Sequence, residues 1–433
     1  MDAALDFELT QRLLDQVGAA GFDAAEVVLT ERAMTEMQID AGDISLLRNT
    51  QNIALVLRGI ALGRYATVHL NQLDPDSVRA GIEQLRQAAQ SAPVDTARAF
   101  AAPQGRLVRD EGPAQAELEP MHARISEFAA EVQRRHPQVK LEQAMLQFDR
   151  TRQLRANTLG LRVDASQGVY DGQAMFSAEQ GTRRSSFNYG GACALDTRAA
   201  LLGWGGLQRL IESSQRELDH VAFEGKFQGS LLLTPECVFS LLDPWLAHLG
   251  DDRLIAGTSR LRGAIGKPVA SNLLTLRVDP DSTAFARREF TTADGYRSLP
   301  STLIEAGVLR SFMLSDYGAR KTGLPRAPNA AQNRIVEPGD TPLATLIAQV
   351  PRGLLMQRFS GGGPAANGDF SGVAKNSYLI EQGRLGAPVS EVMVSGNLFE
   401  MMNSISGISA ESVNDGVTAV PWVRVEGITV AGK

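Results

Sequence analysis

The chain has 433 residues, of which 43% are hydrophobic and 21% charged, and its formal net charge is −6. These values are typical of a folded protein of roughly two or three domains and exclude a disordered or fibrous chain. The mildly acidic balance argues against nucleic acid or anionic lipid as a partner. The sequence has no apolar run long enough to span a membrane and no signal-peptide pattern. It contains only two cysteines, too few for a disulfide framework. We therefore expect a cytoplasmic protein.

The first predicted unit covers residues 1–92 and combines helices with strands. Hydrophobic spacing and β-branched composition predict a helix, two strands and a second helix, in that order, at 7–20, 23–29, 52–65 and 74–89. Asp74 and Pro75 suit the N-cap and the first position of that second helix. Residues 93–116 show little periodicity and are predicted to be a linker.

The second predicted unit, 117–225, repeats this order of elements. Its predicted helices and strands lie at 119–135, 139–148, 152–163, 168–178 and 198–218. Asn49-Thr50 in the first unit and Asn157-Thr158 in the second each precede a predicted turn and hairpin. These parallels fit an internal duplication, but two unrelated helix–sheet units would look the same, so both interpretations stay open.

The remaining residues, 226–433, change in character. Short strand-like runs follow one another between turn residues, at 230–233, 273–278, 302–304, 308–313, 354–359, 377–380, 389–394 and 422–430. Helical periodicity nearly disappears. This pattern predicts a β-rich, sandwich- or barrel-like domain, and therefore an α+β protein whose N-terminal helices and antiparallel sheet precede it.

Motifs for phosphate and structural zinc binding are absent from the sequence. The run 263–267 resembles a P-loop but has Leu261 and Pro268 where the loop needs Gly and Ser or Thr. The five histidines form no closely spaced pair, and neither Cys193 nor Cys237 belongs to a Cys-x-x-Cys motif. A closed structural zinc site is therefore not expected.

Eight short runs follow one another in the C-terminal half, at 303–309, 317–323, 359–364, 367–371, 378–383, 388–392, 396–401 and 428–432. Their order resembles that of the TldD/PmbA family of bacterial and archaeal metalloprotease complexes. The match is dense over about 230–433 and weaker over 1–225. Each run is unspecific alone, and their common order makes the resemblance strong.

The resemblance implies a division of labour between two kinds of subunit. In the TldD branch a helix carries His-Glu-x-x-x-His, and a cysteine near the C-terminus completes a metal site; the PmbA (TldE) branch lacks that site. Members form a TldD–TldE heterodimer that cleaves unstructured peptides, and an older label is "modulator of DNA gyrase".

The matching stretch of this chain has lost most of the metal motif. Aligned on the preceding apolar residues, the first His position is Asp243, the Glu position is Pro244, and only His248 is retained. No cysteine follows Cys237, although the family ligand would lie within 414–419. A zinc protease needs about three protein ligands and a carboxylate base, which these residues do not supply. We therefore expect no catalytic or metal-binding residue here, and interpret Asp243 as the cap of a helix that begins or kinks at Pro244.

The resemblance thus implies a non-catalytic PmbA/TldE-like subunit, active only with a TldD-like partner that holds the zinc. The alternative is a stand-alone or homodimeric peptide-binding or scaffold protein without proteolytic activity. A third interpretation is a hydrolase whose active site lies elsewhere in the chain. The candidate catalytic pairs would be Asp415 with Glu411 and His220 with Asp219, but their spacing matches no known catalytic motif.

Further candidates for a peptide channel or an interface lie in the matched half. They are Gly361, Gly362, Gly363, Asp369, Asn397 and Phe399. The glycine run suits either close backbone approach to a peptide or a tight turn. The Met-rich stretch 393–405 suits either a buried helix after a strand or an adaptable interface.

Overall fold

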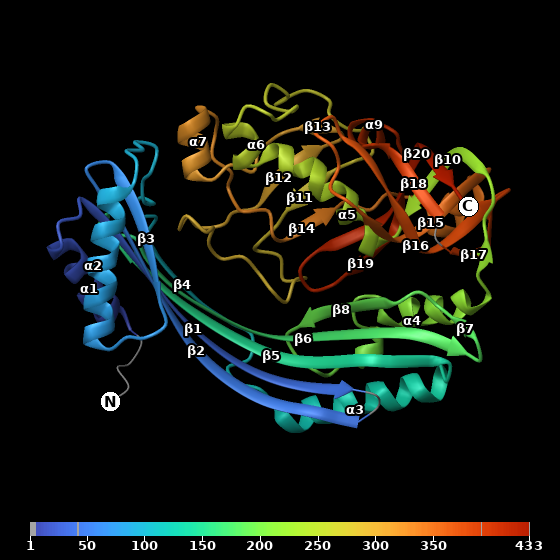
Figure 1. Cartoon of the computed structure of the whole chain (residues 1–433), viewed down its shortest axis with the longest axis horizontal. Helices are drawn as coiled ribbons and strands as arrows, with labels where there is room; N and C mark the ends of the chain where they lie inside the picture. The colour runs from blue at the N-terminus through green and yellow to red at the C-terminus, as the bar shows by residue number, and fades with distance from the viewer. Residues whose placement is uncertain (1–5, 41–42, 391, 433) are drawn as a thin grey trace.

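The computed structural model describes residues 6–40, 43–390 and 392–432. A long curved sheet forms the N-terminal half, and a barrel forms the C-terminal half above the sheet's concave side (Figure 1). Within the described residues, no helix is long and apolar enough to cross a membrane.

The N-terminal half is one antiparallel sheet with a single parallel edge strand. Its strand order is β3-β2-β1-β5-β6-β4, and β7 and β8 pair with β6. The elements are α1 (Phe7–Ala19), β1 (Ala24–Asp40), β2 (Asp43–Ala61), β3 (Arg64–Leu70), α2 (Pro75–Ser91), β4 (Arg106–Glu111), α3 (Leu118–Arg135), β5 (Val139–Asn157), β6 (Arg162–Gln180), β7 (Arg183–Arg184), β8 (Asn188–Ala194) and α4 (Leu207–Arg216).

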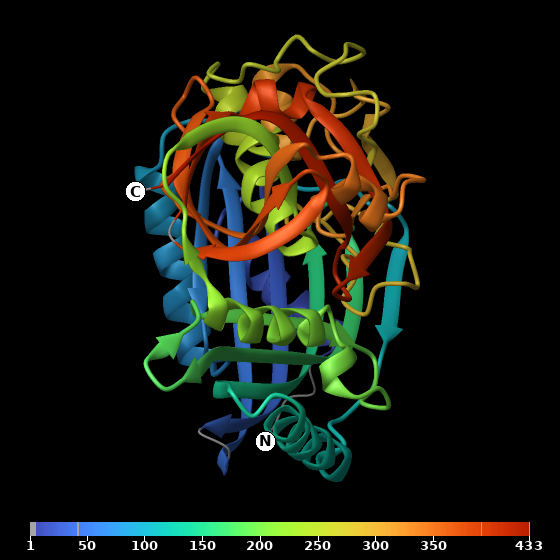
Figure 2. The same cartoon turned by 90° about the vertical axis from the view of Figure 1, so that its right-hand side faces the viewer.

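Two apolar clusters hold these helices on the sheet. α1 and α2 pack at one end against β1, β2 and β3 around Leu55, Leu57 and Leu85. α3 and α4 pack against β5 and β6 around Leu146 and Phe176. α4 lies between the sheet and the barrel, where Ser213 Oγ is 2.8 Å from the Tyr378 hydroxyl of β16 (Figure 2). The helices predicted at 7–20, 74–89 and 119–135 are therefore confirmed.

The sheet differs from the expected one in strand length and continuity. Five short strands were predicted where β1, β2, β3, β5 and β6 run, and the turn between β2 and β3 falls inside the predicted strand 52–65. The expected linker 93–116 contains β4, which pairs in parallel with β6 from Arg106↔Arg162 onward. Both predicted units thus contribute to one sheet, because β1 pairs with β5 along their length.

The two Asn-Thr pairs that suggested an internal repeat do not occupy equivalent positions in the sheet. Asn49 and Thr50 lie inside β2, paired with β1, whereas Asn157 ends β5 and its side chain accepts the backbone N–H groups of Leu159 and Leu161 in the following turn. The order helix, strands, helix does occur twice. The Asn-Thr parallel gives no support for duplication, because only the second pair precedes a turn.

The C-terminal half is built on a twelve-stranded sheet that closes on itself. β20, β10, β15, β16 and β18 pair in turn, and β18 pairs again with β20. The strands are β9 (Val221–Ala222), β10 (Lys226–Leu233), β11 (Leu276–Val278), β12 (Ser301–Glu305), β13 (Val308–Leu309), β14 (Arg334–Val336), β15 (Arg352–Gly361), β16 (Asp369–Glu381), β17 (Arg384–Ser390), β18 (Val392–Asn397), β19 (Ile405–Asn414) and β20 (Ala419–Ala431). Figure 2 shows these strands as a ring.

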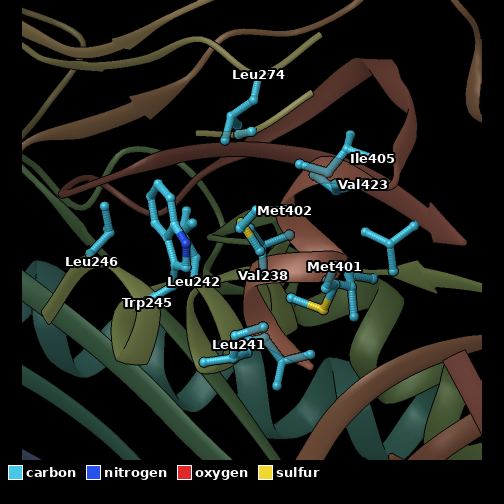
Figure 3. Close-up of a cluster of buried hydrophobic side chains, with 14 of the residues drawn as sticks. Val238, Leu241, Leu242, Trp245, Leu246, Leu274, Met401, Met402, Ile405 and Val423 are labelled. Carbon is cyan, nitrogen blue, oxygen red and sulfur yellow. The ribbon is translucent and has the colours of Figure 1, made fainter. Parts of the chain in front are cut away.

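Helices also occur in this half, where the sequence analysis expected them only near Pro244 and, as one alternative, in the Met-rich stretch. They are α5 (Pro235–Leu246), α6 (Asp251–Ile255), α7 (Asp316–Thr322), α8 (Leu343–Ala348) and α9 (Leu398–Asn403). α5 extends the helix expected at Pro244 back to Pro235, and its buried residues recur at helical spacing opposite the exposed Glu236, Ser240 and Asp243. Trp245 and Leu241 of α5 are 0% exposed in the barrel core (Figure 3). The α+β class with a barrel-like C-terminal region is confirmed.

Candidate functional site

The helix α5 carries Asp243 and Pro244, two of the positions that the resemblance aligns with the TldD-type metal motif. Pro244 lies inside α5, and the helix continues to Leu246, so the predicted cap at Asp243 is wrong. Asp243 instead forms an ion pair with Arg334 at the start of β14. The Arg334 guanidinium also stacks 3.9 Å above the Phe239 ring, one helical turn before Asp243. This contact across 91 positions replaces the local capping bond.

His248 follows α5 in a short 3₁₀ turn and is only 2% exposed. The backbone N–H of Arg260 donates to its Nδ1 at 3.2 Å, and the Arg253 guanidinium contacts its Nε2. The Phe399 ring packs edge-on with a centroid distance of 5.0 Å. Burial, with the charges of Arg253 and Arg260, lowers the pKa of His248 to about 4, so the ring is neutral at pH 7.

These residues do not fit a zinc ion. Asp243 and His248 contact different arginines and have no common contact, as expected for positions five apart on a helix. A guanidinium beside each one opposes the approach of a divalent cation. In the part of the chain that the structure describes, no group of three or more His, Cys, Asp or Glu is arranged to hold a metal.

A cleft of about 580 Å³ opens beside the N-terminus of α5, between the sheet and the barrel. One wall comes from β6 and β8, and the other from α5 and the turn between β19 and β20. That turn reaches down to β8 (Figure 1), where the backbone N–H of Cys193 donates to the Asp415 carbonyl at 2.7 Å. The residues that line the cleft include Asp171, Gln173, Met175, Phe187, Tyr189, Cys193, Glu236, Phe239, Val413, Asp415, Val417 and Val420.

Aromatic and apolar side chains on the sheet wall are exposed to this cleft. Tyr189 is 55% exposed, Phe187 is 44% and Met175 is 37%. The Phe187 and Tyr189 rings lie 6.1 Å apart, and the Arg358 guanidinium stacks 3.5 Å from the Tyr189 centroid. Neighbouring exposed apolar side chains in a concave surface mark a binding site more often than scattered ones do. Sequence reasoning missed Phe187 and Tyr189, although aromatic residues directly before Gly190 and Gly191 were an available signal.

Most charges around the cleft are paired. Glu236 forms an ion pair with Arg209 from α4, and Asp171 lies 3.5 Å from Arg287. Asp415 has backbone and hydroxyl donors instead: Oδ1 accepts the N–H groups of Val417 (2.8 Å) and Thr418 (2.6 Å), and Oδ2 accepts the Thr418 hydroxyl (3.1 Å). The Cys193 thiol donates to Asp171 at 3.3 Å, and burial raises its pKa to about 12, so it stays protonated.

The predicted channel or interface residues lie elsewhere, at the His248 end of α5. Asn397 Nδ2 donates to Asp369 at 2.8 Å, and Asn397 Oδ1 caps α9 by accepting the backbone N–H of Phe399 at 3.0 Å. Phe399 joins this group to His248. The structure thus brings Asp369, Asn397 and Phe399 together, but none of them lines the cleft.

The glycine run and the Met-rich stretch behave differently from each other. Gly361 ends β15, whereas Gly362 and Gly363 are exposed, and an added Cβ at either would meet no atom within 4 Å. Most of the Met-rich stretch is core: Met401 and Met402 of α9 pack against α5, while Met393 is 42% exposed (Figure 3). The buried-helix interpretation of that stretch is therefore confirmed.

Comparisons with known proteins agree with this architecture. A family model described as the PmbA/TldA metallopeptidase C-terminal domain matches residues 227–432. A protein from Haemophilus influenzae named "Metalloprotease TldD homolog" is 30% identical over 205 residues, 40% of this chain and 42% of that protein. The chain matches less than half the length of this and the first curated relative.

Solved structures match the whole fold. TldE from Thermococcus kodakarensis superposes with a TM-score of 0.86 at 19% identity, covering 98% of this chain and 100% of that one. A putative modulator of DNA gyrase from Bacteroides thetaiotaomicron also gives 0.86, at 22% identity with complete coverage of both chains. The family model and the curated relatives identify residues 227–432 as a C-terminal domain of the TldD/PmbA family, and the solved structures show that the similarity of fold extends over the whole chain.

Proposed function

We propose that this chain is a non-catalytic, TldE-like subunit of a TldD–TldE-type metalloprotease complex that degrades or processes unstructured peptides. The observation that carries the proposal is the pair of arginines at the lost metal position. Arg334 engages Asp243, and Arg253 engages His248, so both residues aligned with metal ligands are occupied by cationic partners. Asp243 and His248 alone are fewer than the three protein ligands that a catalytic zinc needs.

In this proposal a TldD-like partner supplies the zinc, the activated water and the general base. This chain contributes no residue to bond cleavage and binds no metal. Its part is to hold the substrate near the partner's site, for which the apolar cleft between sheet and barrel is the best-suited surface.

Co-purification tests this function. The chain is expressed alone and together with a TldD-like protein from the same genome, and each preparation is assayed for metal content and for cleavage of an unstructured peptide. We expect zinc and chelator-sensitive cleavage only when the partner is present, and no cleavage when the partner's zinc-binding histidines are replaced by alanine. Chelator-sensitive cleavage by this chain alone would refute the proposal.

A stand-alone or homodimeric peptide-binding protein is the second candidate. It is favoured by the completeness of the cleft within a single chain, because both walls come from this polypeptide. Sedimentation of the mixture separates the two candidates. A stable complex with the TldD-like protein supports the subunit role, whereas unchanged sedimentation of both proteins supports the alternative.

A further inference from the structure

We propose that the cleft between β8 and the β19–β20 turn selects unstructured peptides that carry a basic side chain, lysine or arginine, and that Asp415 receives its charge. This inference rests on the proposed function and deepens it, because it names the class of peptide and the residues that choose it. The same cleft would act in the chain alone, before any partner supplies chemistry.

The walls of the cleft suit the hydrocarbon part of a long side chain. Tyr189 and Phe187 expose their rings on one side, and Phe239, Val413 and Val417 face them from the other. Lysine and arginine bury their aliphatic stems against apolar surface while the charged end stays solvated or paired.

Charge decides in favour of a basic rather than a neutral side chain. The carboxylates of Glu236 and Asp171 each have an arginine partner. Asp415 is the cleft-lining carboxylate that, in the described parts of the chain, forms no ion pair with Lys, Arg or His. Its three hydrogen bonds come from uncharged donors, and Oδ2 accepts only one of them. A carboxylate offers about four acceptor positions, so Oδ2 can still accept a bond from an ammonium or guanidinium group.

The position of Asp415 in the fold supports this assignment. Asp415 is half-buried, so part of its hydration is already lost and a pairing charge is screened less than at an open surface. Its main chain is fixed to the opposite wall by the bond from the Cys193 N–H, which holds the carboxylate across from Tyr189 and Phe187. The adjacent thiol is protonated and does not compete for a cation.

The test compares two fluorescein-labelled peptides of equal length that differ only at one position, lysine or norleucine. Binding to the full-length chain is measured by fluorescence polarisation at low and high salt. We expect the lysine peptide to bind about tenfold more tightly, the size of effect measured for close, partly buried charge pairs. This preference should shrink as salt increases.

The substitution Asp415→Asn isolates the charge. Asparagine retains Oδ1, which accepts both backbone bonds of the turn, so the turn stays intact. We expect D415N to bind both peptides equally, at the affinity of the neutral one. If D415N keeps the preference for lysine, or if the native chain shows none, the inference is refuted.

A second variant tests the aromatic wall. Tyr189→Ala should weaken binding of both peptides, whereas Leu195→Ala, which removes a side chain of similar exposure outside the cleft, should weaken neither. Equal effects of these two variants would contradict the assignment of the site. These binding measurements use the chain alone and do not depend on proteolysis. If the chain distinguishes the two peptides but its mixture with the TldD-like protein shows no cleavage, the result counts against the proposed function and not against this inference.

Discussion

Burial of Glu217 in the fold changes the pKa of its carboxyl group enough to affect its protonation near neutral pH. Glu217 lies in the 3₁₀ turn after α4, is 5% exposed, and its Oε1 has no hydrogen-bond partner among the described residues. Burial raises the pKa of Glu217 to about 7; Asn376, the Ser186 N–H and Arg358 offset part of that effect. Near neutral pH the carboxyl group is therefore close to half protonated at the contact between α4 and the barrel.

The consequence is a loss of stability as pH rises. Since the folded state holds this proton more tightly than the unfolded chain does, the stabilisation is complete below the unfolded pKa of about 4.5 and is lost as pH rises through about 7. In the native chain, this effect should lower the free energy of unfolding by about 2 kcal/mol between pH 5 and pH 8, and Glu217→Gln should abolish that part of the change. Urea unfolding at a series of pH values measures it. Glu224→Gln, at an exposed position nearby, is the control and should leave the slope unchanged.

Single residues were predictable from the sequence only where their partners are close along the chain. Asp74 caps α2 as expected, because it accepts the N–H groups of Asp76 and Ser77. Asp243 has the same Asp-Pro signature but pairs with Arg334, which no local pattern indicates. The sequence shows that Asp243 and Pro244 differ from the residues of the TldD-type motif, but it does not indicate that arginines contact Asp243 and His248.

At the scale of elements, substitutions in the glycine run at the end of β15 can distinguish a role in folding from a role in function. Gly362→Leu should leave the free energy of unfolding within about 0.5 kcal/mol of the native value, since the new side chain meets open space. If this loop faces the substrate or the partner, the same substitution should reduce proteolysis by the complex. Parallel loss of stability and activity would leave only a role in the turn.

Gly361 provides the contrasting variant. An added Cβ there would lie 2.7 Å from the Phe359 ring and 2.8 Å from the Ser371 carbonyl oxygen. Gly361→Ala should therefore destabilise the barrel by about 1–3 kcal/mol, as overpacking usually does. The two substitutions differ by one position, so their comparison distinguishes a steric requirement of the strand from a functional requirement of the loop.

Element types followed from the sequence better than element lengths. Helices α1, α2 and α3 have one apolar face each, and their periodicity located them. β5 was divided into two predicted strands because polar residues such as Asp149 and Arg152 interrupt its apolar pattern. In the sheet these residues pair with charges on neighbouring strands, Asp149 with Arg32 and Arg152 with Asp164, so the strand continues through them.

At the scale of the whole molecule, the β19–β20 turn is one of the places where the barrel contacts the sheet, and it lines the cleft. Gly416 fixes this turn within the barrel half, because its carbonyl accepts the backbone N–H groups of Ala286 and Arg287 at 2.9 and 3.0 Å. The neighbouring Asp415 carbonyl binds Cys193 of the sheet. The sequence predicted the two halves but not these contacts, because they join backbone groups more than 100 positions apart and leave no side-chain pattern.

Gly416→Ala should therefore weaken the contact between the β19–β20 turn and β8. The stability lost in this way should exceed the stability lost through backbone strain in the turn. Gly416 has a φ of +82°, and an added Cβ would lie 2.1 Å from the Cys193 carbonyl oxygen. Gly427 has a φ of +79°, but a Cβ added there would come no closer than 3.9 Å to its nearest neighbour, Gln228 Nε2, so Gly427→Ala reproduces the backbone strain without the collision. We expect G416A to lose at least about 1 kcal/mol more stability than G427A in urea unfolding, and to lose affinity for the lysine peptide as the cleft walls separate. Equal losses of stability in the two variants would mean that the contact between the turn and β8 does not stabilise the protein.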